Sequence, residues 1–143
     1  MTSEFGGIER RLDELSERLS RLEPLRNRPR DDFAEDAYLR DIVERNLEVA
    51  AQCCIDIAGR LIAMEGAQKP ADYQEAILRL GELNILDVDF ARHLAPIAGF
   101  RNILIHEYLV VDWDKVYGYL QRLHELEQFA GQVRTWLLKR LSN

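Results

Sequence analysis

Apolar residues in the first part of the chain recur at steps of three and four, which places them on one face of a helix. The positions are Ile8, Leu12, Leu15, Leu19 and Leu22. With charged residues between them, this pattern predicts an amphipathic helix over residues 8–23 that ends at Pro24. The leucines could belong to the core or form a seam for a partner, and we favour core packing as the simpler interpretation.

A short basic connector follows, with Arg26, Arg28 and Arg30 around a proline, Pro29, that prevents the first helix from continuing. The chain beyond it predicts a long central helix over residues 31–65. Its main apolar stripe consists of Leu39, Val43, Leu47, Ala50, Cys54, Ile57, Leu61 and Met64. A second stripe appears only in the later half, at Ala51, Ile55, Ala58 and Ile62. We therefore expect that half to be covered on two sides.

Three further helices are predicted, over residues 71–81, 87–106 and 112–141. Asp87 is placed to cap the second of these, Pro96 should kink or restart it, and Asp112 or Asp114 is placed to cap the last. No segment alternates apolar and polar residues as a strand does. The chain is thus predicted to be all-α, a single domain over residues 1–143 folded as an up-and-down bundle of four to five helices.

Composition narrows the functional classes. The 143 residues are 47% hydrophobic, enough for one core, and 19 Lys and Arg against 25 Asp and Glu give a net charge of −6. Such a chain does not hold nucleic acid by bulk charge, so any contact must be local. No apolar run approaches the roughly 20 residues of a membrane span, and the first seven residues do not form a signal peptide, so we expect a cytoplasmic protein without membrane contact. The adjacent Cys53 and Cys54 are expected to be reduced core residues and not metal ligands.

One polar stretch interrupts the core pattern, residues 101–108, which read RNILIHEY. Arg101, Asn102, His106 and Tyr108 supply hydrogen-bonding or titrating groups that are useful at a phosphodiester. On one straight helix Arg101 and His106 lie about 140° apart, so both cannot point inward. Either the helix ends just before His106, or a second subunit completes the site. Cleavage of RNA without a metal needs a base, an acid and a cation, and a symmetric dimer offers two histidines and two arginines.

Structural roles are also open to these residues, because Arg, His and Tyr near a helix end often cap carbonyls or pair with acids. His93 and His124 are interpreted as surface or satisfied boundary residues. Trp113 and Trp136 are interpreted as packing anchors. The connector arginines could touch RNA phosphates, although a solvated connector is the simpler interpretation.

Residues 101–108 resemble the Arg-x4-His-x-Tyr signature of the HepT toxins, in the DUF86 branch of the HEPN superfamily, and residues 46–58 resemble the long second helix of that family. The resemblance implies a homodimeric helical ribonuclease that needs no cofactor. Arg101 and His106 would be its catalytic residues in a cleft between subunits, with Asn102 in a supporting role. It also implies an antitoxin partner, an MntA-type nucleotidyltransferase that uses ATP to attach AMP to Tyr108. Added phosphates there would repel and block RNA.

Two other functional classes remain open on sequence grounds. One is a non-catalytic helical module that binds a nucleotide or docks on a nucleotidyltransferase, which would need Tyr108 but not His106. The other is a helical oligomerisation domain. A metal-independent endoribonuclease that forms one half of a toxin–antitoxin pair is the function that we expect.

Overall fold

The structure is a computed structural model that describes residues 3–99 and 111–142, and every described regular element is helical. A 3₁₀ turn, η1 (Glu23–Leu25), follows the first helix. The α-helices are α1 (Ser3–Leu22), α2 (Arg30–Glu35), α3 (Ala37–Met64), α4 (Tyr73–Glu82), α5 (Val88–Leu94), α7 (Trp113–Leu120) and α8 (Leu123–Leu141).

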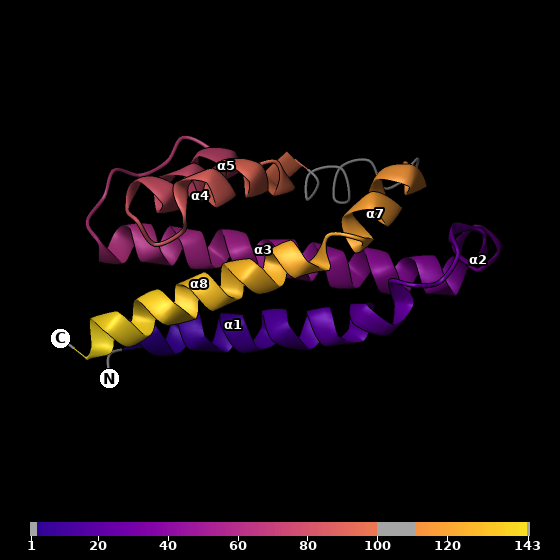
Figure 1. Cartoon of the computed structure of the whole chain (residues 1–143), viewed down its shortest axis with the longest axis horizontal. Coiled ribbons are helices and arrows are strands. Elements are labelled where there is room, and N and C mark those ends of the chain that lie inside the picture. Colours follow the sequence, from indigo (N-terminus) through magenta and orange to yellow (C-terminus); the bar gives the residue numbers. More distant parts are fainter. Residues whose placement is uncertain (1–2, 100–110, 143) are drawn as a thin grey trace.

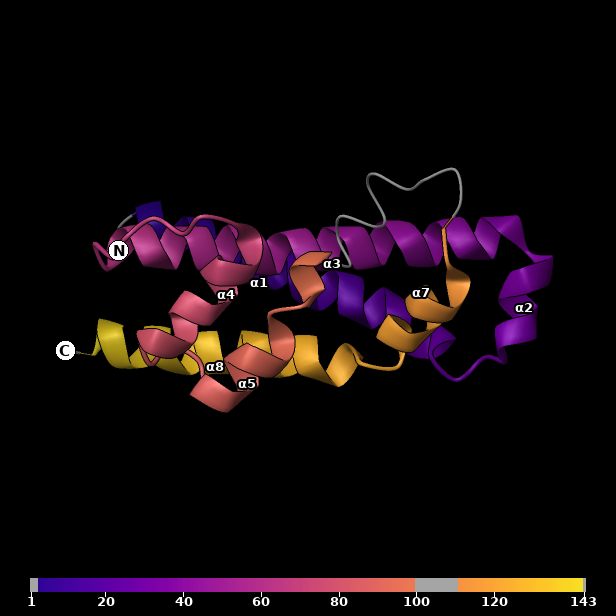
Figure 2. The ribbon, with the colours of Figure 1, turned by 90° about the horizontal axis from the view of Figure 1, so that it is seen from above.

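The long helices α1, α3 and α8 run up and down beside one another (Figure 1). Helix α4 covers the C-terminal half of α3, and α5 packs on α4 beside α8 (Figure 2). Helix α7 lies over the N-terminal half of α3 near α2 (Figures 1 and 2). The two chain termini lie at the same end of the bundle (Figure 1). None of the described helices is both long and apolar enough to cross a membrane.

The apolar face of α1 is core. Ile8, Leu15 and Leu22 are fully buried, and Leu12 and Leu19 are only 2% and 3% exposed. This face packs against α3, and the start of α1 and the end of α8 also meet. The prediction of core packing, in place of a seam for a partner, is therefore confirmed.

The predicted central helix over residues 31–65 is wrong in one respect, because two helices replace it. Asp36 is extended (φ −128°, ψ 99°) and its carboxylate accepts a hydrogen bond from the backbone N–H of Leu39 (3.1 Å), so it ends α2 and caps α3. Phe33 of α2 is fully buried. A short side chain that satisfies a free N–H makes this break favourable without a glycine or proline. The two stripes of the later half are buried from Ala50 to Ile62, as predicted.

The predicted helix over residues 112–141 is also interrupted. Helix α7 ends at Leu120, the backbone N–H of Arg122 donates to the carbonyl of Tyr119 (2.9 Å), and α8 begins at Leu123. Leu120 and Leu123 are both buried, so the apolar spacing of three continues across the turn and conceals it in the sequence. The cap at Asp87 and the interruption at Pro96 are confirmed, since α5 ends at Leu94 and helix resumes at residues 97–99.

Candidate functional site

The four predicted site residues, Arg101, Asn102, His106 and Tyr108, lie outside the described residues, within positions 100–110. The two predicted geometries, a helix that ends before His106 and a site completed by a second subunit, therefore stay predictions. The structure does describe what precedes and follows this stretch.

The segment before the stretch, residues 95–99, which we call the preceding flank, packs in the core. Ala95, Ile97 and Ala98 are 1%, 5% and 4% exposed. The backbone N–H of Gly99 donates to the carbonyl of Pro96 (2.9 Å), which continues the helical turn to the last described residue before the stretch. The main chain therefore enters residues 100–110 from a fixed, buried position.

The segment after the stretch, residues 111–113, which we call the following flank, also packs against the rest of the protein. Val111 is half-buried against the core, and the Asp112 carboxylate accepts from the backbone N–H of Asp114 (3.0 Å) to cap α7. The Trp113 ring stacks on Phe33 with centroids 5.4 Å apart and an interplanar angle of 18°. Trp113 is thus the packing anchor that the sequence predicted, and it ties the exit of the stretch to α2.

A charged cluster supports the preceding flank. Glu125 of α8 is only 6% exposed, and its carboxylate binds Arg122 through two contacts (Nε–Oε2 2.5 Å and a second nitrogen to Oε1 2.8 Å). His93 of α5 adds a third contact, Nε2–Oε1 at 2.9 Å. Burial raises the pKa of the Glu125 carboxyl, but the hydrogen bonds and charge of Arg122, with the nearby histidines, outweigh it and hold the pKa below its ordinary value. Glu125 is therefore a buried carboxylate that links α5 to the start of α8.

The apolar side of this cluster touches the flank itself. Leu94, Ile97 and Leu126 line a small void beside Arg122 and Glu125 whose volume of about 10 Å³ leaves no room for a ligand. The interpretation of His93 as a surface or satisfied boundary residue is confirmed. The sequence did not reveal that its partners are Arg122 and Glu125. The spacing of Arg122 and Glu125 was a visible signal for an ion pair on one helix, whereas the link to His93 depends on the fold.

A family model described as "Ribonuclease HepT-like" matches residues 11–133. The chain belongs to this family. It is 30% identical over 132 residues to the tRNA nuclease HepT of Aphanizomenon flos-aquae, which covers 92% of this chain and 90% of that protein. It is 28% identical to the mRNA nuclease HepT of Shewanella oneidensis, over 71% of this chain and 77% of that protein.

The fold of this HepT-like chain matches a solved structure as well. A tri-AMPylated HEPN toxin of Shewanella oneidensis, in complex with an MNT antitoxin, superposes with a TM-score of 0.80 at 24% identity, over 94% of this chain and 99% of that one. The predicted family and the predicted helical bundle are therefore confirmed.

The three connector arginines of the HepT-like chain contact carboxylates. Each connector arginine is ion-paired: Arg26 with Glu23 (3.0 Å), Arg28 with Asp32 (3.2 Å) and Arg30 with Asp114 (2.6 Å).

Cys53 and Cys54 are free and buried, and burial raises the pKa of Cys53 to about 11. Within residues 3–99 and 111–142, no three His, Cys, Asp or Glu side chains gather as a metal site would require.

Proposed function

We propose that this protein is a metal-independent endoribonuclease, the toxin of a toxin–antitoxin pair, with Arg101 and His106 as its catalytic residues. The observation that carries the proposal is the nearly full-length match to a relative named as a tRNA nuclease. The segment that holds the Arg-x4-His-x-Tyr spacing lies inside the matched region of the family model. Both flanks of that segment are packed, which suits residues that must be positioned precisely.

The chemistry follows from the two side chains. His106 takes the proton of the 2′-hydroxyl or gives one to the leaving 5′-oxygen, and Arg101 stabilises the charge that develops on the phosphorane. Asn102 positions the RNA or His106. Because Arg101 and His106 would lie about 140° apart on one straight helix, we propose a homodimer in which each site combines the arginine of one subunit with the histidine of the other.

Tyr108 is the proposed point of control. It follows His106 by two residues, so AMP units attached to its hydroxyl would carry negative charge to the place where RNA phosphate binds. The cognate partner would be an MntA-type nucleotidyltransferase. Support comes from the AMPylated toxin that shares this fold and is bound to its antitoxin.

The decisive test measures RNA cleavage by the purified protein in the presence of EDTA, together with growth arrest on induction. We expect Arg101→Ala and His106→Ala to lose about 10²- to 10⁴-fold in cleavage rate, the range for a general acid or base, and to relieve toxicity. Tyr108→Phe should cleave and arrest growth but resist AMPylation. His124→Ala is the matched control, because His124 is an exposed histidine outside the motif.

The dimeric site has its own test, a mixture of the Arg101→Ala and His106→Ala proteins. If each site combines the arginine of one subunit with the histidine of the other, a mixed dimer regains one intact site and cleavage returns. If both residues act within one subunit, the mixture stays inactive. A His106→Ala protein that folds and cleaves RNA as fast as wild type would refute the catalytic proposal and favour a non-catalytic docking role.

A further inference from the structure

A hollow of about 830 Å³ opens on the C-terminal half of α3, at the end of the bundle where the termini lie (Figure 1). Its walls come from α1, α3, the loop over residues 65–72 and the first turn of α4. The volume lies within the range of ligand pockets. All the residues that line it lie between positions 11 and 76, so the pocket does not include the flanks of residues 100–110.

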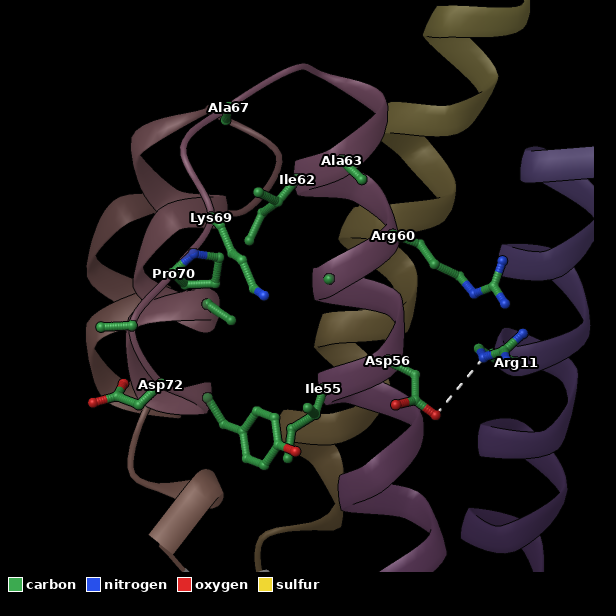
Figure 3. A pocket seen from close by; sticks show the side chains of 14 residues that line it. Arg11, Ile55, Asp56, Arg60, Ile62, Ala63, Ala67, Lys69, Pro70 and Asp72 are labelled. Carbon is green, nitrogen blue, oxygen red and sulfur yellow. Dashed lines mark ion pairs between the residues drawn. The ribbon is translucent and has the colours of Figure 1, made fainter.

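Two guanidinium groups crowd one side of this pocket. Arg60 reaches from α3 toward α1, where its head group lies beside that of Arg11 (Figure 3). A Cβ placed on Gly7 would lie 2.7 Å from a terminal nitrogen of Arg60 and 3.8 Å from one of Arg11. Asp56 is the acidic neighbour of the pair, and it lies 3.8 Å from Arg11. Two positive charges with one carboxylate leave a net attraction for an anion.

A third cation lies on the opposite side of α3. Lys69 extends from the loop into the space between that loop and α3 (Figure 3). Among the described residues, neither Lys69 nor Arg60 has an ion pair or hydrogen bond, whereas most described arginines are paired with a carboxylate. Two of the three cations that line this pocket are therefore without an ion pair or hydrogen bond in the part of the chain that the structure describes.

Gly59 leaves the helix surface between these cations uncovered. A glycine within a helix destabilises it by roughly 0.5–1 kcal/mol relative to alanine. Here a Cβ would meet nothing within 4 Å, so packing does not require the glycine. Apolar side chains surround it, among them Ile55 and Ile62, and Tyr73 at the rim is 45% exposed. The pocket therefore combines an open helix backbone, an apolar wall, an aromatic ring and cations on two sides. Two carboxylates, Asp56 and Asp72, also line it, so three cations face two acids and the net charge of the lining stays positive.

We propose that this pocket binds a short stretch of single-stranded RNA that crosses α3 at Gly59. One phosphate lies against Arg11 and Arg60, another against Lys69, and a base packs on the apolar wall near Tyr73. Cations on two sides of an apolar surface fit a chain of phosphates joined by flat apolar groups, and single-stranded sites elsewhere combine basic grooves with aromatic platforms. The inference rests on the proposed function for its ligand class, and it places substrate binding away from the cleavage motif.

The test measures binding of an unstructured oligoribonucleotide of about ten residues, within the span of single-strand sites, by fluorescence anisotropy. All variants are made in full-length His106→Ala protein, so that cleavage does not interfere. We expect Lys69→Glu and Arg60→Glu each to weaken binding about tenfold or more. Each should also lower the slope of log affinity against log salt by about 0.7, the value for one phosphate contact on a single strand. Gly59→Trp should block the site.

Two matched controls separate the pocket from general charge and from helix stability. Lys139→Glu reverses an exposed lysine of α8 outside the pocket, and Gly59→Ala adds a single methyl group where there is space. Both should bind RNA within about twofold of the parent. Thermal unfolding by circular dichroism checks each variant, and the exposed Lys69 and Arg60 keep the test valid if Gly59→Trp does not fold.

Equal RNA affinity in the parent, Lys69→Glu and Arg60→Glu would overturn the inference, as would equal losses in Lys139→Glu. Binding of a mononucleotide or an acidic peptide, but not the oligomer, would overturn it too. The outcomes remain separate from those of the proposed function. Pocket-dependent binding with no cleavage by wild type refutes only the nuclease, whereas cleavage that needs His106 but is indifferent to Lys69 and Arg60 refutes only this site.

Discussion

The connector between α1 and α2 and the pocket on α3 each hold three cations, but they differ in what those cations contact. In the connector, Arg26, Arg28 and Arg30 are all within 3.2 Å of a carboxylate oxygen. In the pocket, Arg11 lies 3.8 Å from Asp56 and the other two have no described ionic partner. The density of basic residues in the sequence is therefore a poor guide to available charge, because neighbouring acids decide how much of it remains for a ligand.

The connector also serves as a structural joint. Its backbone carbonyls accept hydrogen bonds from α7 and the turn after it, with the Tyr117 hydroxyl donating to Arg28 (3.0 Å) and the Gln121 amide to Arg26 (2.8 Å). Phe33, just beyond it, packs between Trp113 and Tyr117. Changes in the connector region should therefore alter stability, and changes in the pocket should alter RNA affinity.

The largest expected effect is at Phe33. Phe33→Ala should lower the free energy of unfolding by about 3–5 kcal/mol, since it removes a fully buried ring and leaves a cavity under Trp113. Urea unfolding measures this loss. Phe33→Leu, which keeps most of the apolar volume, is the control and should lose clearly less. A loss below about 1 kcal/mol for the alanine variant would show that the joint does not contribute to stability as argued.

Tyr117→Phe should cost about 1 kcal/mol of unfolding free energy, the usual contribution of one hydrogen bond. The change removes only the hydroxyl that donates to the Arg28 carbonyl. Tyr38→Phe is the matched control, because Tyr38 is 84% exposed and should show no effect. RNA affinity should stay unchanged in both variants, and a loss of affinity in Tyr117→Phe would extend the RNA site to the connector.

Gly59→Ala should raise the free energy of unfolding by about 0.5–1 kcal/mol, because alanine is the better helix former and its methyl group meets nothing within 4 Å. Gly66→Ala provides a contrast of opposite sign. Gly66 has φ +64°, a conformation that strains a side chain, so alanine should destabilise the loop after α3. Chemical denaturation of both proteins checks the pair. A destabilised Gly59→Ala would mean that Gly59 has a structural role.

The smallest expected effect on stability is at the pocket cations. Lys69→Gln and Arg60→Gln should change the free energy of unfolding by no more than about 0.5 kcal/mol, as is usual for surface substitutions. Their effect should instead appear in RNA binding. If either variant is strongly destabilised, that cation is a structural residue, and the contrast with the connector disappears.

Much of the fold could be read from residue spacing. The leucines of α1 and the two stripes of α3 follow helical periods, so their burial was predictable. The break at Arg122 was not, because the apolar spacing of three continues across it from Leu120 to Leu123. The break at Asp36 was not either, because it depends on one aspartate cap in a segment without glycine or proline. An N-cap formed by one aspartate and a turn flanked by buried leucines leave almost no trace in a pattern of hydrophobicity.

The candidate sites differ in how far the sequence alone could predict them. Residues 101–108 form a contiguous motif, so Arg101 and His106 could be proposed from sequence alone. The cluster of His93, Arg122 and Glu125 required α5 to lie against α8. The pocket cations come from positions 11, 60 and 69, and only the folded chain brings them together.

Both chain ends lie at the pocket end of the bundle, and the ion pair between Arg140 and Glu65 (2.7 Å) fastens the last turn of α8 to the end of α3. A fluorophore attached to the C-terminus is therefore carried near the pocket and far from α7, where the motif segment returns to the core. Energy transfer from such a label to a dye on RNA would report where each end of the strand lies, and so the direction in which a substrate runs along the protein.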